Sequence, residues 1–531
     1  MSDINRVIAQ MLTNTWQILT RSMLHSKRLI HLPCSTQLTR MIPVYKRTTL
    51  LLFLLLAQLF LHAQPCREVV GYYPNWQWYD RSQLVRPATI DYSKYTIINY
   101  CFFNPQPNGD IVTGDSWADE NLLLGQINWS TTPPSYYPNT SIVDLAHNNN
   151  VKVLISVGGW TWSNNFPSIA ANPATRANFA HSCNDLVRQY NLDGIDLDWE
   201  YPGYAPHNGG PADAANFTLL LQQVRDSLDA LELVNNEQYL LTAAVGASAA
   251  HMSNVQWTAV TPLLDMINLM SYDFFGAWDA MANHNSPLNS PACGDPGFNI
   301  STAFTLLTQQ YGVPANKINV GVAFYGRSQT GYTGLCQATS GNAATTAFPP
   351  DGAPLYYEIA AQQSQYTYNW DSQAQVPWLN NNAGVFLSFD NERSIGLKAQ
   401  FIVSNGARGA IIWEITGDYL ETAPGSGIIA GTPLADTLNA VFCASPLGAE
   451  AAAAQSPLQL APNPASGMVS IVPAPVQPTR YRIYTATGAL AESGILPSGT
   501  NTLNISTLPA GVYIISLETA GQNSQHKLIT Y

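Results

Sequence analysis

The segment Leu192-Asp-Gly-Ile-Asp-Leu-Asp-Trp-Glu200 alternates strand-forming apolar residues with acidic ones. Successive side chains of a β-strand point to opposite faces, so Asp196, Asp198 and Glu200 are expected on one face and their apolar neighbours on the other. Along the strand, successive carboxyl groups would lie about 6 to 7 Å apart. Like charges that converge at low dielectric raise at least one pKa, which suits the outermost carboxyl group to act as a general acid near neutral pH.

An exposed edge strand or a calcium-binding loop is the alternative interpretation of this segment. Trp199 and the apolar positions need burial, however, and the glycine spacing of an EF-hand loop does not follow. We therefore interpret the segment as a buried strand that ends in a carboxylate site.

The chain has 531 residues and a formal net charge of −12. Its length predicts one large domain and a smaller one, because single hydrophobic cores rarely grow beyond about 250 to 300 residues. The acidic balance argues against nucleic acid as a partner. Aromatic residues are numerous, with 13 Trp and 26 Tyr, and flat rings suit surfaces that bind sugars.

The N-terminal region has the layout of a signal peptide. Two basic residues precede the apolar run 49–61, and Leu61-His-Ala63 supplies a possible cleavage site. A transmembrane anchor is the alternative, but the run is shorter than the roughly 20 residues that a spanning helix needs. We expect Met41 to be the initiator, residues 1–63 to be an upstream extension and signal peptide, and the mature chain to have no stable membrane anchor.

Six cysteines follow residue 63, and none belongs to a C-x-x-C pair, so a zinc or redox motif has no support. Export would permit disulfides, but several of these residues could simply be small and buried. The histidines show no ligand spacing either, and we expect neither a metal nor a cofactor. The cysteines are Cys66, Cys101, Cys183, Cys293, Cys336 and Cys443.

Eight apolar, β-branched segments recur between Cys66 and Cys443, and helical periodicity is plain at 176–190, 213–231 and 395–404. Alternation of strands and helices predicts an α/β fold, a closed (β/α)₈ TIM barrel, with chemistry at the C-terminal ends of its strands. The expected strands are Val69–Asn75, Tyr95–Phe103, Lys152–Gly159, Leu192–Glu200, Tyr239–Ser248, Met266–Phe274, Ile318–Gly326 and Gly409–Thr416.

More than 80 residues separate the seventh and eighth expected strands, which predicts a small α+β insertion at about residues 329–390, forming one wall of a cleft. The barrel domain would cover residues 64–443. An Ala-rich linker is expected at 444–457, and short alternating strands at 458–531 predict a C-terminal all-β sandwich module.

The acidic segment, continued as Glu200-Tyr-Pro-Gly203, closely resembles the signature of family 18 chitinases. The resemblance spans about residues 67–443 and implies a chitinase that hydrolyses β-1,4-linked N-acetylglucosamine polymers with retention. Further segments that resemble the strand motifs of the family are Val69-Val-Gly-Tyr-Tyr73, Asn99-Tyr-Cys-Phe102, Ser156-Val-Gly-Gly-Trp160, Met270-Ser-Tyr-Asp273, Tyr325-Gly-Arg327 and Trp413-Glu414.

The resemblance also implies roles for four catalytic residues. Glu200 would protonate the glycosidic oxygen, and the nucleophile would be the acetamido oxygen of the sugar, because this family is an exception to the two-carboxylate mechanism. Asp198 would stabilise the oxazolinium charge, Asp196 would share a proton with it, and Tyr272 would donate to the acetamido oxygen. Substrate-binding residues are expected at Tyr72, Phe102, Ser156, Gly159, Trp160, Met270, Asp273, Trp278, Tyr325, Arg327 and Trp413.

Some of these assignments have a purely structural alternative. Tyr72 and Ser156 would support Asp196, but they and Met270 could merely fill the barrel, and Arg327 could be structural too. Aromatic candidates balanced between cleft and core are Trp76, Trp117, Trp162 and Trp370. The resemblance further implies non-proline cis peptides at Cys101–Phe102, Glu200–Tyr201 and Trp413–Glu414.

The C-terminal module resembles the sorting domains that the type IX secretion system reads, at Leu460–Ala465, Tyr484–Gly488 and Leu508–Tyr513. A carbohydrate-binding module is the alternative, but residues 458–531 contain no tryptophan. The resemblance implies a protein exported to the exterior or cell surface of a Gram-negative bacterium, and we expect a monomer. Its partners would be the secretion machinery, chitin and chito-oligosaccharides.

Two other functions share part of this pattern. An endo-β-N-acetylglucosaminidase acting on N-glycans has the same acidic motif, but the insertion after Arg327 and the presence of Trp413 argue against it. A non-catalytic chitin-binding protein would lack the acid, whereas Glu200 is present.

Overall fold

The computed structural model describes residues 66–443, 459–461, 465–472, 479–485, 490–499, 501–519 and 522–530. Residue contacts divide the chain into two compact units, Met1–Ser445 and Pro446–Tyr531. The signal peptide expected at 1–63 with its start at Met41, the linker expected at 444–457, and motif residues 462–464 and 486–488 lie outside the described residues.

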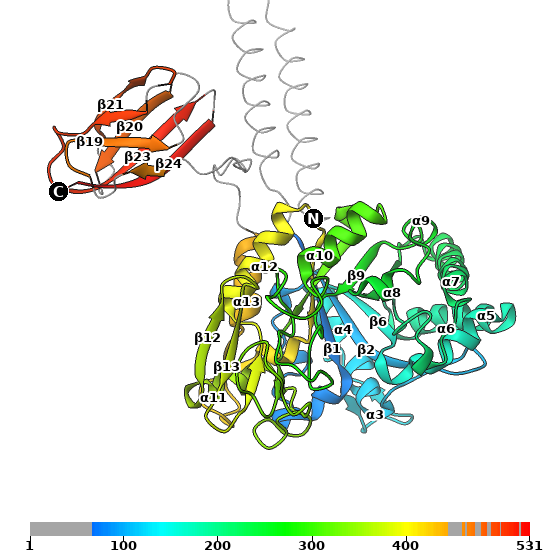
Figure 1. Cartoon of the computed structure of the whole chain (residues 1–531). Helices are drawn as coiled ribbons and strands as arrows, with labels where there is room; N and C mark the ends of the chain where they lie inside the picture. Colours follow the sequence, from blue (N-terminus) through cyan, green and yellow to red (C-terminus); the bar gives the residue numbers. More distant parts are fainter. Residues whose placement is uncertain are drawn as a thin grey trace, which may run out of the picture. The chain divides into compact units, whose positions relative to one another are not determined.

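Eight parallel strands close into a barrel, which confirms the expected fold class (Figure 1). They pair in the order β1-β15-β10-β9-β8-β7-β6-β2, and β1 also pairs with β2, so the barrel is complete. Each overlaps one expected segment: β1 (Glu68–Pro74), β2 (Ile97–Pro105), β6 (Lys152–Gly158), β7 (Gly194–Asp198), β8 (Leu240–Gly246), β9 (Met266–Met270), β10 (Ile318–Ala323) and β15 (Gly409–Trp413).

Several strands end earlier than the sequence predicts. β7 ends at Asp198 and β9 at Met270, so Glu200 and Tyr272 lie in the loops that follow. Asp273 has a φ of +57°, a left-handed conformation that cannot continue an extended strand. The functional candidates are therefore held partly by strands and partly by the loops at the carboxyl end of the barrel.

Helices cover the outside of the barrel, and three of them contain the segments with expected helical periodicity (Figure 1). In α6, Pro173 occupies the first turn, Asn172 caps the Ala174 N–H, and Asn191 ends the helix in a left-handed conformation. The main helices are α4 (Ile142–Asn148), α5 (Phe166–Ala171), α6 (Pro173–Tyr190), α7 (Asp213–Asn235), α10 (Ile300–Thr305), α12 (Glu392–Ser404) and α13 (Pro433–Phe442).

The expected α+β insertion lies between β10 and β15. Its antiparallel sheet has the order β11-β14-β13-β12 and is accompanied by α11 (Tyr356–Gln362). A fully buried His284, from the loop after β9, lies 3.1 Å from the Asp371 carboxylate of the insertion. The strands are β11 (Arg327–Gln329), β12 (Thr367–Asp371), β13 (Val376–Asn380) and β14 (Phe386–Ser388).

The C-terminal unit contains two antiparallel sheets, β18-β19-β22 and β21-β20-β23-β24. Apolar side chains of both sheets, such as Val469 and Ile515, are buried in one core, as expected for an all-β sandwich. The sequence reasoning indicated β19, β20, β22 and β23 but missed β18, β21 and β24; most residues of β24 are polar. The strands are β18 (Gln459–Ala461), β19 (Met468–Val472), β20 (Thr479–Thr485), β21 (Leu490–Leu496), β22 (Thr502–Asn504), β23 (Gly511–Thr519) and β24 (Gln522–Thr530).

Two disulfides link distant parts of the barrel unit. Cys66 pairs with Cys443 across 377 residues, and Cys293 pairs with Cys336 between the loop after β9 and the insertion. Cys101 and Cys183 are buried and free. Among the described residues, no helix combines the length and the apolar character that crossing a membrane requires.

Candidate active site

The carboxyl end of β7 places two acidic side chains inside the barrel. Parallel pairing with β6 and β8 sets Asp196 between Ser156 and Thr242. Asp196 is fully buried, and Asp198 is buried beside it. Glu200 lies two residues beyond the end of β7 and is half-buried.

Four donors surround the Asp196 carboxylate. Its Oδ2 atom accepts hydrogen bonds of 2.8 Å from both Tyr72 Oη and Ser156 Oγ. Its Oδ1 atom accepts one of 3.1 Å from Asn268 Nδ2 and another from Thr242 Oγ1. Burial raises the pKa of Asp196, and these four hydrogen bonds oppose that rise because they favour the ionised carboxylate. The sequence reasoning placed Tyr72 and Ser156 here but missed the other two donors.

The surroundings of Asp198 and Glu200 raise the pKa of both carboxyl groups. Burial raises the pKa of Asp198 well above its ordinary value, and repulsion from Glu200 and Asp196 adds to the rise. The Asp198 Oδ1 atom is buried without a hydrogen-bond partner among the described residues. Burial likewise raises the pKa of Glu200 to about 7, although a hydrogen bond with the Tyr201 side chain lowers it. A carboxyl group that titrates near 7 can give and take a proton at neutral pH.

The loop after β9 carries Tyr272 and Asp273. The Asp273 carboxylate accepts a hydrogen bond of 2.6 Å from Tyr325 Oη and two of 2.7 Å from the Arg327 guanidinium group. Two-point pairing fixes the orientation of both groups. The guanidinium carbon of Arg327 also lies 5.2 Å from the Trp278 ring. Burial and nearby carboxylates raise the pKa of Tyr272 strongly, so its hydroxyl remains a donor at neutral pH.

Trp413 forms the centre of an aromatic cluster at the end of β15. Its ring lies 5.7 Å from those of Phe102 and Tyr72, and it stacks on Phe102 with an interplanar angle of 21°. A side chain at Gly159, where φ is +75°, would approach the Phe102 ring to 2.7 Å, so glycine is required there. Met270 packs in the same cluster.

Two indole side chains among the candidates are prominently exposed. Trp160 is 53% exposed and Trp278 is 60% exposed, so both rings are available to stack on a sugar. Of the weaker candidates, Trp76 and Trp117 are also exposed, whereas Trp162 and Trp370 are half-buried.

The three peptide bonds expected to be cis are cis: Cys101–Phe102, Glu200–Tyr201 and Trp413–Glu414. In the parts of the chain that the structure describes, no group of three or more His, Cys, Asp or Glu side chains is placed to hold a metal ion.

Comparison with curated proteins identifies relatives named chitinases. The chain is 38% identical over 404 residues to Chitinase A1 of Niallia circulans, an alignment that covers 67% of this chain and 57% of that protein. It is 33% identical over 365 residues to Endochitinase 1 of Metarhizium robertsii, covering 65% of this chain and 80% of that protein.

Solved structures give the same assignment. Chitinase ChiA74 from Bacillus thuringiensis matches with a TM-score of 0.62 and 29% identity, covering 88% of this chain and 85% of that one. Residues 459–531 match the model of the secretion system C-terminal sorting domain. Residues 68–418, which contain the whole barrel and its carboxylate site, match the model of glycosyl hydrolases family 18. This chain therefore belongs to glycosyl hydrolase family 18.

Proposed function

We propose that this protein is a secreted chitinase that hydrolyses β-1,4-linked N-acetylglucosamine polymers with retention, by substrate-assisted catalysis. The observation that carries the proposal is the pair formed by Asp198 and Glu200. One is a buried carboxyl group whose Oδ1 atom has no partner among the described residues, and the other is an acid whose pKa is about 7. The names of the relatives support the choice of substrate.

In the first step, Glu200 gives its proton to the glycosidic oxygen as the bond from that oxygen to C1 breaks. The acetamido oxygen of the same sugar forms a bond to C1 and closes an oxazolinium ion. Asp198 accepts a hydrogen bond from the acetamido N–H and stabilises the positive charge, while the proton that it held passes to Asp196. The Tyr272 hydroxyl donates to the acetamido oxygen and fixes its direction of attack.

In the second step, the Glu200 carboxylate takes a proton from a water molecule whose oxygen bonds to C1 and opens the oxazolinium ring. Two displacements at one carbon return the original anomeric configuration. Trp413 would lie beneath the reacting sugar, and Asp273 with its two partners would line the wall. The exposed rings of Trp160 and Trp278 would bind sugars farther along the chain.

We further propose the division of the chain. Residues 1–63 would be an upstream extension and signal peptide starting at Met41, 64–443 the catalytic domain, 444–457 a linker and 458–531 the sorting domain. The match of residues 459–531 to a sorting-domain model supports export to the exterior or surface of the cell, and we propose that this cell is a Gram-negative bacterium and that the protein is a monomer. Deleting residues 458–531 should keep the enzyme inside producing cells, and normal export of the truncated chain would contradict this assignment.

The catalytic proposal is tested with the purified full chain and N-acetylated chitohexaose. Wild type should release shorter oligosaccharides, and Glu200→Gln should lower kcat by at least about 10² to 10⁴-fold while binding is retained. The matched control is Glu237→Gln, an exposed glutamate before β8, which should retain wild-type activity. Wild-type turnover by Glu200→Gln, or release of glycans from N-glycoproteins in place of chitohexaose cleavage, would contradict the proposal.

A further inference from the structure

The loop after β7 places one histidine between Glu200 and an exposed tryptophan. His207 ends a short 3-10 helix, Ala205–His207, and is only 9% exposed. Its Nδ1 atom lies 2.6 Å from the backbone oxygen of Glu200, where a protonated Nδ1 donates a hydrogen bond to that carbonyl. Its ring centre lies 4.5 Å from that of Trp160, with an interplanar angle of 63°. His207 thus contacts the backbone of one site residue and the ring of another.

Hydrogen bonds anchor the loop that carries His207 on both sides of the histidine. The backbone N–H groups of Gly203 and Gly210 donate hydrogen bonds of 2.9 and 2.8 Å to the Asp213 carboxylate at the start of α7. Asn208 Nδ2 donates one of 3.1 Å to the backbone oxygen of Asn164, in the segment that begins with Trp160. These hydrogen bonds anchor the loop on both sides of His207.

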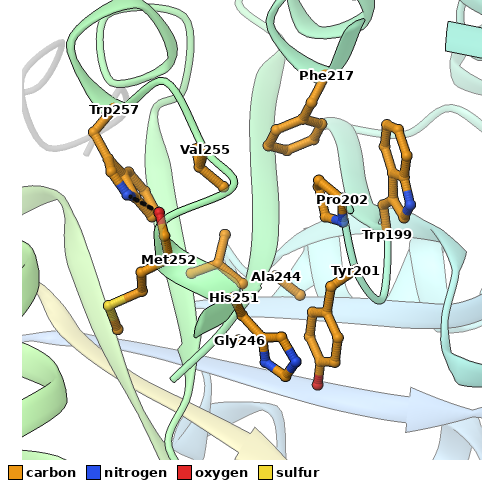
Figure 2. Close-up of a pocket in the computed structure, with 11 residues that line it drawn as sticks. Trp199, Tyr201, Pro202, Phe217, Ala244, Gly246, His251, Met252, Val255 and Trp257 are labelled. Atoms are coloured by element: carbon orange, nitrogen blue, oxygen red, sulfur yellow. Dashed lines mark hydrogen bonds between the residues drawn. The ribbon is translucent and has the colours of Figure 1, made fainter. Parts of the chain in front are cut away.

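Aromatic rings continue the packing behind His207. Tyr204 meets the His207 ring edge-on at 5.3 Å and also lies 6.2 Å from His251. His251 in turn stacks on Tyr201 at 3.9 Å with an angle of 18°. Figure 2 shows these last two rings side by side at one end of a mainly apolar pocket. This packing leaves the loop little freedom to move away from Glu200.

The neighbouring segment holds Glu200 from its amide side. The Glu200 N–H donates a hydrogen bond of 2.8 Å to Ser163 Oγ, which itself donates to the Gly159 oxygen at 2.9 Å. Trp160 follows Gly159 directly. Glu200 and Trp160 are thus connected through Ser163 on the amide side and through His207 on the carbonyl side, and the Trp160 backbone also makes a hydrogen bond with the Glu200 carboxyl group.

We propose that His207 is a positioning residue. It holds Glu200, the proposed acid, and the Trp160 indole, the proposed sugar-stacking surface, in fixed positions relative to each other. This role rests on the proposed chitinase function. The Nδ1–H group fixes the Glu200 carbonyl, and with it the direction in which the Glu200 side chain leaves the backbone. The ring edge fixes the Trp160 indole, and with it the line along which a bound polysaccharide enters the site. Displacements of about 1 Å in either group are enough to slow a reaction that depends on alignment.

Two substitutions separate the two contacts. In His207→Asn, the side-chain amide can occupy the place of Nδ1 and donate to the carbonyl, but the ring against Trp160 is lost. In His207→Phe, the ring remains and the donor is lost. His207→Phe should lower kcat on N-acetylated chitotriose about tenfold or more with KM little changed, because the acid is misaligned. His207→Asn should keep kcat within about twofold and raise KM for chitohexaose about fivefold, because the Trp160 indole is no longer held by the His207 ring.

Trp160→Ala removes the indole itself and shows how much KM depends on it. It should reproduce the KM change of His207→Asn, and the double variant should add nothing further, because both changes remove one shared function. Melting temperatures identify any variant that fails to fold, and His207→Met, which also lacks a donor, then replaces His207→Phe. Unchanged kcat in the donor-free variants, or full additivity of His207→Asn with Trp160→Ala, would overturn the positioning role. An inactive wild type would instead overturn the proposed function and this role with it.

Discussion

The Tyr72 hydroxyl donates a hydrogen bond of 2.8 Å to the Oδ2 atom of Asp196, although 124 residues separate them. The bond favours the ionised form of a fully buried carboxylate. In the proposed mechanism, an ionised Asp196 accepts the proton that Asp198 loses before the positively charged intermediate forms. Tyr72 is therefore linked to the proposed chemistry through Asp196, and its ring also contacts that of Trp413.

Tyr72→Phe removes this hydroxyl and keeps the ring. The pKa of Asp196 should rise, and kcat on chitohexaose should fall about tenfold or more, since a hydrogen bond to a charged group contributes roughly 1.5 to 3 kcal/mol. Tyr73→Phe is the matched control: its hydroxyl donates to the Val85 backbone oxygen and takes no part in the site. Equal kcat values for the two variants would show that the Tyr72 hydroxyl does not act on Asp196.

The raised pKa of Glu200 predicts how activity depends on pH. The acid must be protonated to act, so kcat/KM should fall as pH rises through about 7. A plot of kcat/KM against pH for a soluble chito-oligosaccharide tests this. A constant kcat/KM from pH 6 to pH 9 would contradict the assignment of Glu200 as the acid.

The same pKa predicts the pH dependence of stability. The folded pKa of Glu200, about 7, lies above the ordinary value of 4.5, so the folded state binds more protons between these limits. The contribution of Glu200 is fully present below about pH 4.5 and is lost as pH rises through about 7. Glu200→Gln removes this dependence, so its melting temperature relative to wild type should be higher at pH 8 than at pH 4. A difference independent of pH would contradict the burial of the charged form.

Local sequence patterns were sufficient to predict the barrel, its eight strands and the insertion. Strand and helix patterns depend on residues that are close together in the sequence, so they can be recognised without knowing the fold. They also placed Asp196, Asp198 and Glu200 on one segment. Thr242 and Asn268 were missed because the sequence does not show toward which residue a single polar side chain in an apolar strand points. Only the register of β7, β8 and β9 shows that both face Asp196.

Contacts between distant loops could not be predicted from the sequence either. Nothing in the sequence indicates that His207 reaches the Glu200 carbonyl, because the turn that brings it back depends on Asp213 accepting two backbone hydrogen bonds. The cysteine pairs were left open for the same reason. Cys66 and Cys443 come together only in the folded barrel unit, where the start of β1 lies beside the end of α13.

The exposed indole of Trp278 predicts a difference between substrates. Trp278→Ala should lower the rate on polymeric chitin more than the rate on chitotriose, because a short substrate does not need sites remote from the scissile bond. Reducing-end assays on both substrates provide the comparison. Equal losses on the two substrates would argue against stacking and for a structural role beside Arg327.

The disulfide between Cys66 and Cys443 predicts a stability effect without a catalytic one. It joins the start of β1 to the end of α13, away from the carboxyl ends of the strands that carry the site. Replacing both cysteines with serine should lower the free energy of unfolding by about 2 to 5 kcal/mol and leave kcat at 20 °C within about twofold of wild type. Reduced wild type, which also loses the bond between Cys293 and Cys336, should be no more stable than the double variant. An unchanged melting temperature would show that the bond does not stabilise the barrel.

Substrate assistance is tested most directly by removing the acetyl groups of the substrate. Purified wild-type enzyme is given N-acetylated chitohexaose or the fully deacetylated hexamer, and ¹H NMR follows the anomeric protons of the products from the first minutes. The acetylated hexamer should be cleaved with initial release of the β-anomer, and the deacetylated hexamer should resist cleavage because it lacks the acetamido nucleophile. Comparable cleavage of the deacetylated hexamer, or initial release of the α-anomer, would contradict the mechanism.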